Sequence, residues 1–299
     1  MIGLSMAKKK DNGQISMFDI ELPPQAECTA MAESREEIFP ARVPDEEFTL
    51  TTAPKDIPTV TEILKLLEKG LYKVNAHEFL SDVFECGAIA VSNKFDLRQA
   101  PEREERYLRI VKKYDHDMQM LLVDVFGKIY VLLTSQIFPN VGFNDYLGEL
   151  YMRSETSNSK AGQFFTPYHL SKACAMVCIN SGTVEEHIQQ DKILTLNEPA
   201  CGAGGMVLAA ADVLYYQYHF NYSRNLLVEC SDIDSRCVHM TYLQLGLAGI
   251  PAVIYQRDTL SMKTWQRWET PAYIMQWPRF RKVFNEGYQW FPGKEAANQ

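Results

Sequence analysis

The fold is decided by residues 193–205, which read Ile-Leu-Thr-Leu-Asn-Glu-Pro-Ala-Cys-Gly-Ala-Gly-Gly. The first four residues form an apolar run that predicts a buried strand, and residues 205–218 predict the helix that follows. Glycines between a strand and a helix let the backbone approach a ligand without Cβ clashes, and the start of the helix presents free N–H donors. This stretch therefore predicts a ligand-binding turn.

The alternation of strands and helices continues toward the C-terminus. Residues 226–230 and 252–255 predict two further strands with a helix over 234–248 between them, and residues 272–275 predict a fourth strand. Such alternation implies a parallel sheet with helices on its faces.

The residues upstream predict a different architecture. Residues 1–57 are rich in Pro, Glu, Ala and Thr and are expected to be a disordered tail and linker. Residues 58–160 predict a helical domain, and residues 161–299 the domain that holds the sheet. The expected helices begin at the capping-box sequence Thr59-Val60-Thr61-Glu62 and continue over 77–91, 101–113, 115–138 and 145–152.

Composition limits the partners and the location of the protein. The 299 residues carry a net charge of -8, so a nucleic acid must meet a local patch or a partner chain. The longest apolar stretch, 120–138, is interrupted by Asp124 and Lys128, so no membrane span is expected. Without a secretory signal or a Cys-x-x-Cys pair, the chain is expected in the cytoplasm with reduced thiols. Cys174 and Cys178, one helical turn apart, are either core residues or metal ligands.

Acidic residues follow each of the first three expected strands. Glu198 suits a ligand with a positive amine better than one with a pyrophosphate. Asp232 can accept hydrogen bonds from both hydroxyls of a ribose, whereas Asp234 is expected to cap the next helix. Asp258 is placed either to accept from an adenine amine or to stabilise a turn. Together these acids predict a nucleoside-containing ligand.

The motifs together resemble a known family. Gly-Gln-Phe-Phe-Thr-Pro at 162–167, Glu-Pro-Ala-Cys-Gly-Ala-Gly-Gly at 198–205, Asp-Ile-Asp at 232–234 and Asp-Thr-Leu at 258–260 resemble the N6-adenine DNA methyltransferases. The modification subunits of type I restriction-modification systems share this order, and the resemblance covers roughly residues 60 to 280.

The resemblance implies a Rossmann-like S-adenosylmethionine-binding α/β fold, incomplete at its C-terminus and preceded by helices. It also implies S-adenosylmethionine as cofactor, DNA as substrate, a partner subunit and no metal. The implied cofactor residues are Gln163, Phe164, Phe165, Thr166 and Pro167 at the methionine end, Glu198, Pro199, Ala200, Cys201, Gly202, Ala203, Gly204 and Gly205 below it, Asp232 on ribose and Asp258 on adenine. One of the two phenylalanines is expected only to pack in the core.

The chain departs from the family after the expected fourth strand. Family members have Asn-Pro-Pro-aromatic there, whose amide accepts from the adenine amine while the aromatic ring stacks on the flipped base. Spacing places Trp277, Pro278, Arg279 and Phe280 in this slot. Because an indole N–H only donates, Trp277 cannot replace the Asn. The protein is then either a methyltransferase that works alone or with a partner, or a catalytically deficient regulator of a DNA modification complex.

Two further interpretations remain. A nicotinamide-dependent enzyme would use a similar glycine turn but has no role for the Thr-Pro motif. In the tail, Gln14, Met17 and Phe18 resemble a peptide that docks on the bacterial sliding clamp.

Overall fold

The computed structural model describes residues 56–69, 74–155 and 165–285. The clamp-like residues Gln14, Met17 and Phe18 lie outside this part of the chain.

The N-terminal region is helical, as the sequence predicts. Thr59 caps the first helix: its hydroxyl accepts from the Glu62 N–H at 3.2 Å, and the Glu62 carboxylate accepts from the Thr59 N–H at 2.7 Å. The helices are α2 (Val60–Glu68), α3 (Ala76–Ser92), α4 (Ala100–Val111), α5 (His116–Ser135) and α6 (Tyr146–Glu155).

A four-stranded sheet follows in the order β1-β2-β3-β4. Its strands are β1 (Leu194–Glu198), β2 (Leu226–Asp232), β3 (Ala252–Asp258) and β4 (Lys263–Glu269). The first three are parallel, and β4 runs antiparallel to β3. The carboxyl ends of β1, β2 and β3 therefore meet at one edge, which confirms the expected α/β fold.

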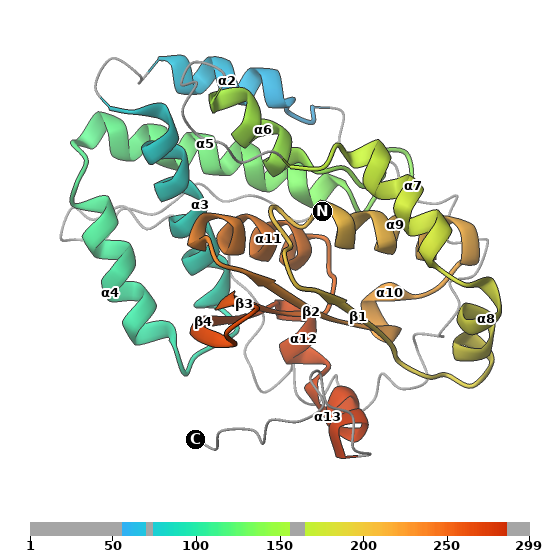
Figure 1. Cartoon of the computed structure of the whole chain (residues 1–299). Helices are drawn as coiled ribbons and strands as arrows, with labels where there is room; N and C mark the ends of the chain where they lie inside the picture. The colour runs from blue at the N-terminus through green and yellow to red at the C-terminus, as the bar shows by residue number, and fades with distance from the viewer. Residues whose placement is uncertain (1–55, 70–73, 156–164, 286–299) are drawn as a thin grey trace.

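Helices cover both faces of this sheet. In Figure 1, α7 (Tyr168–Cys178), α9 (Gly205–Tyr218) and α11 (Ser235–Leu247) lie on one side. The other side carries α12 (Pro271–Met275) and α13 (Trp277–Asn285). The short α10 (Tyr222–Asn225) contacts α9, and α8 (Ser181–Gln189) lies beyond β1.

The predicted fourth strand at 272–275 is wrong. These residues form α12, because the Thr270 hydroxyl caps the Tyr273 N–H and Pro271 begins the helix with a fixed φ. The actual fourth strand lies earlier, in β4, where five of seven residues are exposed. An exposed edge strand lacks the apolar run by which a buried strand is recognised.

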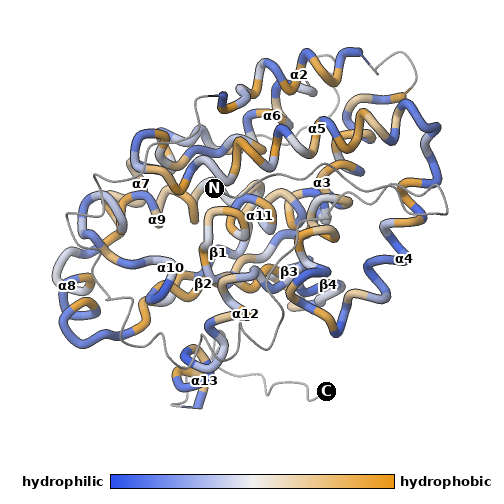
Figure 2. Tube along the Cα trace, turned by 180° about the vertical axis from the view of Figure 1, so that it is seen from behind, coloured by the Kyte–Doolittle hydropathy of each residue, from blue (hydrophilic) through white to orange (hydrophobic). Residues whose placement is uncertain are grey.

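The helical region and the sheet share one hydrophobic core. A single cluster of buried side chains runs from Val60 in α2 to Trp268 in β4, and α11 packs against α3 as well as β3. Figure 2 shows the apolar residues concentrated between these layers and polar residues along the outer side of α4. On α7, Cys174 is half-buried and Cys178 is exposed, so neither is a core residue. Within the described residues, α5 alone is long and apolar enough to cross a membrane, and it packs against α2, α3 and α11.

Burial of His239 makes stability depend on pH. This α11 side chain lies against the Trp268 ring, and burial lowers its pKa from 6.5 to about 4. Because the folded state excludes the proton, His239 stabilises the fold above pH 6.5 and loses this contribution as the pH falls toward 4. Wild-type protein should lose about 3 kcal/mol of unfolding free energy over this pH range because of His239, and His239→Gln should not show this part of the loss. Urea unfolding of the wild type and of His239→Gln at pH 7 and pH 4.5 measures this contribution. An equal loss of unfolding free energy in the two proteins would contradict the assignment to His239.

Candidate functional site

The glycine turn after β1 is shaped by close neighbours. Gly202 has φ +54°, and a Cβ there would lie 2.9 Å from Cδ1 of Phe165. A Cβ on Gly205, the first residue of α9, would lie 2.8 Å from a carboxylate oxygen of Asp145. Side chains at these two positions would displace the half-buried Phe165 and the buried Asp145, so glycine is required for packing as well as for access to the backbone.

Asp232 joins the ends of β1 and β2. One carboxylate oxygen accepts from the Gly202 N–H at 2.9 Å, and the other accepts from the Asp234 N–H at 2.9 Å. Burial raises the pKa of Asp232, while these N–H donors lower it. A carboxylate has about four lone-pair sites, so Asp232 keeps acceptor capacity for a further donor. Asp234 caps α11, as predicted, with its side chain accepting from the Arg236 N–H.

Asp258 stabilises the turn after β3. Its carboxylate accepts from the Leu260 N–H at 3.0 Å and from the Ser261 hydroxyl at 2.7 Å. These bonds, led by the Ser261 side chain, lower its pKa. The adjacent Thr259 hydroxyl donates to the Pro199 carbonyl at 2.7 Å. The turn that Asp258 stabilises is therefore tied to the loop after β1.

The remaining loop residues differ in exposure. Cys201, Ala203, Gly204 and Gly205 are buried, Glu198 and Gly202 are half-buried, and Pro199 and Ala200 are exposed. The Glu198 carboxylate accepts from the Ala200 N–H at 3.1 Å.

Three polar residues that the sequence did not single out for this site also hold the loop. On α11, the Thr241 hydroxyl donates to the Gly202 carbonyl at 2.8 Å, and the Gln244 amide donates to the Ala203 carbonyl at 2.7 Å. The same amide donates to the Asp145 carboxylate at 2.7 Å. Burial raises the pKa of Asp145. Thr241 and Gln244 stand three residues apart on a helix of mostly buried residues, a pattern that could have indicated their role.

The segment before α7 brings Phe165 to the same loop. Its ring packs against the Tyr151 ring with centroids 5.6 Å apart and against Gly202. Thr166 and Pro167 follow on the surface, where Pro167 begins α7. Gln163 and Phe164, also expected at the methionine end, lie outside the described residues.

The expected catalytic slot does not follow a strand. Trp277, Pro278, Arg279 and Phe280 form the first turn of α13. Phe280 is buried against Tyr273 with ring centroids 5.8 Å apart, and Arg279 pairs with Asp191 at 3.0 Å. The expected role depends on a strand at 272–275, and these residues form the helix α12. These four residues therefore do not lie at the end of a strand, which the expected catalytic role requires.

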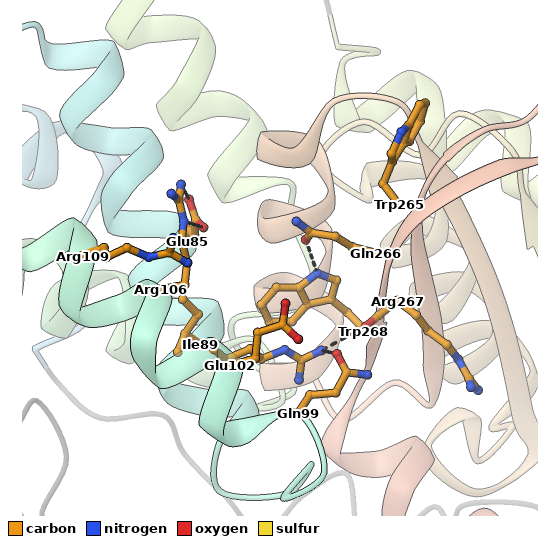
Figure 3. A pocket seen from close by; sticks show the side chains of 11 residues that line it. Glu85, Ile89, Gln99, Glu102, Arg106, Arg109, Trp265, Gln266, Arg267 and Trp268 are labelled. Atoms are coloured by element: carbon orange, nitrogen blue, oxygen red, sulfur yellow. Dashed lines mark hydrogen bonds and ion pairs between the residues drawn. The ribbon is translucent and has the colours of Figure 1, made fainter. Parts of the chain in front are cut away.

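A cleft lies between α4 and β4, away from the glycine turn (Figure 3). This cleft has a volume of about 430 Å³. Arg103 lies 4.0 Å over the Trp268 ring, and Arg106 pairs with Glu85 at 2.6 Å. Trp265 is 45% exposed at the rim, and the Arg109 side chain makes no polar contact with a described residue. The cleft combines available positive charge with an exposed aromatic ring, although the charges of Arg103 and Arg106 are paired.

Comparison with known proteins identifies the family. The model of the N-6 DNA methylase family matches residues 143–291. Across these residues, the chain belongs to the N-6 DNA methylase family. The matched stretch contains the whole sheet and the three loops at its carboxyl edge. It also begins ahead of Asp145, so the family extends into the helical region that holds the glycine turn.

A solved structure is also similar to this methylase-family chain. It is the methyltransferase subunit of a type I restriction-modification system from Streptococcus thermophilus, with 16% identity and a TM-score of 0.33. The similarity covers 81% of this chain and 48% of that subunit, so the chain spans about half of its length. No curated protein sequence matches the chain.

Proposed function

We propose that the protein binds S-adenosylmethionine at the carboxyl ends of β1, β2 and β3. The observation that carries this proposal is the position of Asp232. Its carboxylate is fixed by the Gly202 and Asp234 N–H groups and keeps acceptor capacity for a further donor. An acceptor held in this way suits the two neighbouring hydroxyls of a ribose.

The other loops suit the two ends of the cofactor. We assign the methionine end to Gln163, Phe164, Phe165, Thr166 and Pro167 and to the turn 198–205, where Glu198 would attract the amino group. We assign the adenine to Asp258, whose two oxygens accept from the Leu260 N–H and the Ser261 hydroxyl and keep further lone pairs.

The reaction we propose is methyl transfer from this cofactor to the N6 amine of adenine in DNA, in a complex with a partner subunit. S-adenosylmethionine supplies the methyl group, and the loop residues hold it in place. Among the described residues, β1 pairs only with β2, and no strand pairs with its other edge. A partner strand at this edge would lie beside the glycine turn and could supply the acceptor for the adenine amine.

The alternative is a catalytically deficient regulator that binds the cofactor within a DNA modification complex. It is favoured by the observation that Trp277 and Arg279 serve the packing and ion pairing of α13. Transfer of labelled methyl groups to adenine-containing DNA, with and without candidate partner subunits, separates the two functions. Labelled N6-methyladenine supports the methyltransferase. Cofactor binding without transfer in every combination supports the regulator.

We further propose that the cleft between α4 and β4 contacts the DNA substrate. Arg109→Gln removes an available cation and Trp265→Ala an exposed ring, so both should weaken oligonucleotide binding. For single-stranded DNA, the Trp265 change should cost on the order of tenfold, and the Arg109 change should reduce the salt slope by about 0.7.

Fluorescence anisotropy over a salt series measures both effects. Lys112→Gln is a matched control, because Lys112 is an exposed cation on the α4 end that does not line the cleft. Unchanged affinity of both cleft variants, or loss caused instead by Arg281→Gln on α13, would contradict a role for the cleft.

Two finer assignments complete the proposal. The motif of Gln14, Met17 and Phe18 is proposed to dock on a sliding clamp, which would bring the methylase near newly made DNA.

A cytoplasmic location is consistent with the cysteines of the described residues, all of which are free thiols.

A further inference from the structure

We infer that His77, Tyr151 and Arg236 form a latch that positions Phe165 over Gly202 and so controls binding of the amino-acid end of the cofactor. This inference rests on the proposed cofactor site and adds positioning residues from the helical region. It is carried by a ring of contacts that joins five separate segments of the chain, at His77, Tyr151, Phe165, Gly202 and 232–236.

The latch begins between α3 and α6. The His77 Nε2 atom lies 2.6 Å from the Tyr151 hydroxyl, and the two rings lie 4.8 Å apart. The Arg236 guanidinium approaches the same Nε2 atom at 3.2 Å. Since a guanidinium only donates, this geometry favours Nε2 as the acceptor. His77 thereby joins α6 to the start of α11.

Tyr151 carries the contact to the cofactor turn. Its side chain is 1% exposed, so its ring has little freedom to move. The Phe165 ring packs on it at 5.6 Å, and the opposite contact of Phe165 is Gly202, where a Cβ would approach to 2.9 Å. Phe165 is thus held between a fixed ring and the glycine turn.

The ring of contacts closes through the acidic loop. Gly202 donates to Asp232, Asp232 accepts from the Asp234 N–H, and the Asp234 carboxylate pairs with Arg236 at 2.5 Å. Arg236 then returns to His77. The turn after β1 and the loop after β2 are therefore both connected to the helical region through one set of side chains.

The position of the latch predicts a selective effect on binding. Phe165 belongs to the segment assigned to the methionine end, whereas the adenine is assigned to Asp258 after β3. Loosening Tyr151 should therefore weaken the binding of ligands that contain the amino-acid portion and leave the binding of ligands that lack it unchanged. If Tyr151 only stabilised the fold, its substitution would weaken the binding of both kinds of ligand equally.

Tyr151→Phe tests the latch, because it removes the hydroxyl and keeps the ring that packs on Phe165. The ligands are S-adenosylhomocysteine, which has the amino-acid portion, and methylthioadenosine, which lacks it. We expect the dissociation constant of the first to rise by on the order of threefold to tenfold, the equivalent of one hydrogen bond, and that of the second to stay unchanged. His77→Phe, which removes Nε2 and keeps a ring, should have the same effect.

Tyr114→Phe is the matched control. The Tyr114 hydroxyl also donates a partly buried hydrogen bond in the helical region, to Asp82 at 2.7 Å, but this bond lies away from the glycine turn. It should change neither dissociation constant. Equal weakening of both ligands, or unchanged binding of S-adenosylhomocysteine by both latch variants, would overturn the latch. Failure of the unchanged protein to bind either ligand would instead overturn the cofactor site.

Discussion

Asp232→Asn is expected to weaken S-adenosylmethionine binding by about 100-fold or more. The carboxylate already accepts from the Gly202 and Asp234 N–H groups, one on each oxygen. An amide has a single acceptor atom, so its NH₂ group must face one of these donors or the ribose. Hydrogen bonds to a charged group contribute about 1.5–3 kcal/mol each, and the substitution affects more than one of them.

Equilibrium titration of both proteins measures this loss. Asp124→Asn is a suitable control, because it removes the same charge from an exposed position on α5. Far-UV circular dichroism of Asp232→Asn establishes that the fold persists. Affinity within about threefold of the unchanged protein would remove Asp232 from the site.

Asp145→Ala is expected to reduce the free energy of unfolding by about 3–5 kcal/mol. The substitution leaves the Gly148 N–H and the Gln244 amide without their acceptor in a buried region. Each unsatisfied donor costs about 1–3 kcal/mol, and the lost side-chain volume adds to this. Because Gln244 also holds the Ala203 carbonyl, the glycine turn should loosen as well.

Asp145→Asn separates these bonds from the charge. The amide oxygen can still accept from both donors, so the loss should stay below about 1.5 kcal/mol at neutral pH. Burial raises the folded-state pKa of Asp145, so the wild-type carboxyl loses stability as the pH rises through that value. The loss of unfolding free energy caused by Asp145→Asn, relative to wild type, should therefore be smaller at pH 7 than at pH 4. Urea unfolding at both pH values measures this; a smaller loss for Ala than for Asn would contradict the hydrogen-bond network.

Local patterns predicted the elements that carry the site. The helix expected at 205–218 matches α9, and the strands expected at 226–230 and 252–255 lie within β2 and β3. These elements have apolar runs or a helix start marked by glycines, which are local signals. The edge strand β4 has no such run, whereas the apolar residues 272–275 of α12 predict a strand that does not form.

Long-range contacts account for what the sequence did not predict. Asp145 and Gln244 are 99 residues apart, and His77 and Arg236 are 159 apart. The cleft likewise combines arginines of α4 with tryptophans of β4. No local periodicity joins such pairs, so the supports of the glycine turn became visible only in the folded chain. The acids after β1, β2 and β3 were accessible to sequence reasoning because parallel strands end at a common edge.

Calorimetric titration of the full chain with S-adenosylmethionine tests the central claim most directly. The account predicts a saturable binding isotherm with one site per chain and a rise in thermal stability at saturating ligand. Absence of heat at several temperatures, together with an unchanged melting temperature, would contradict it.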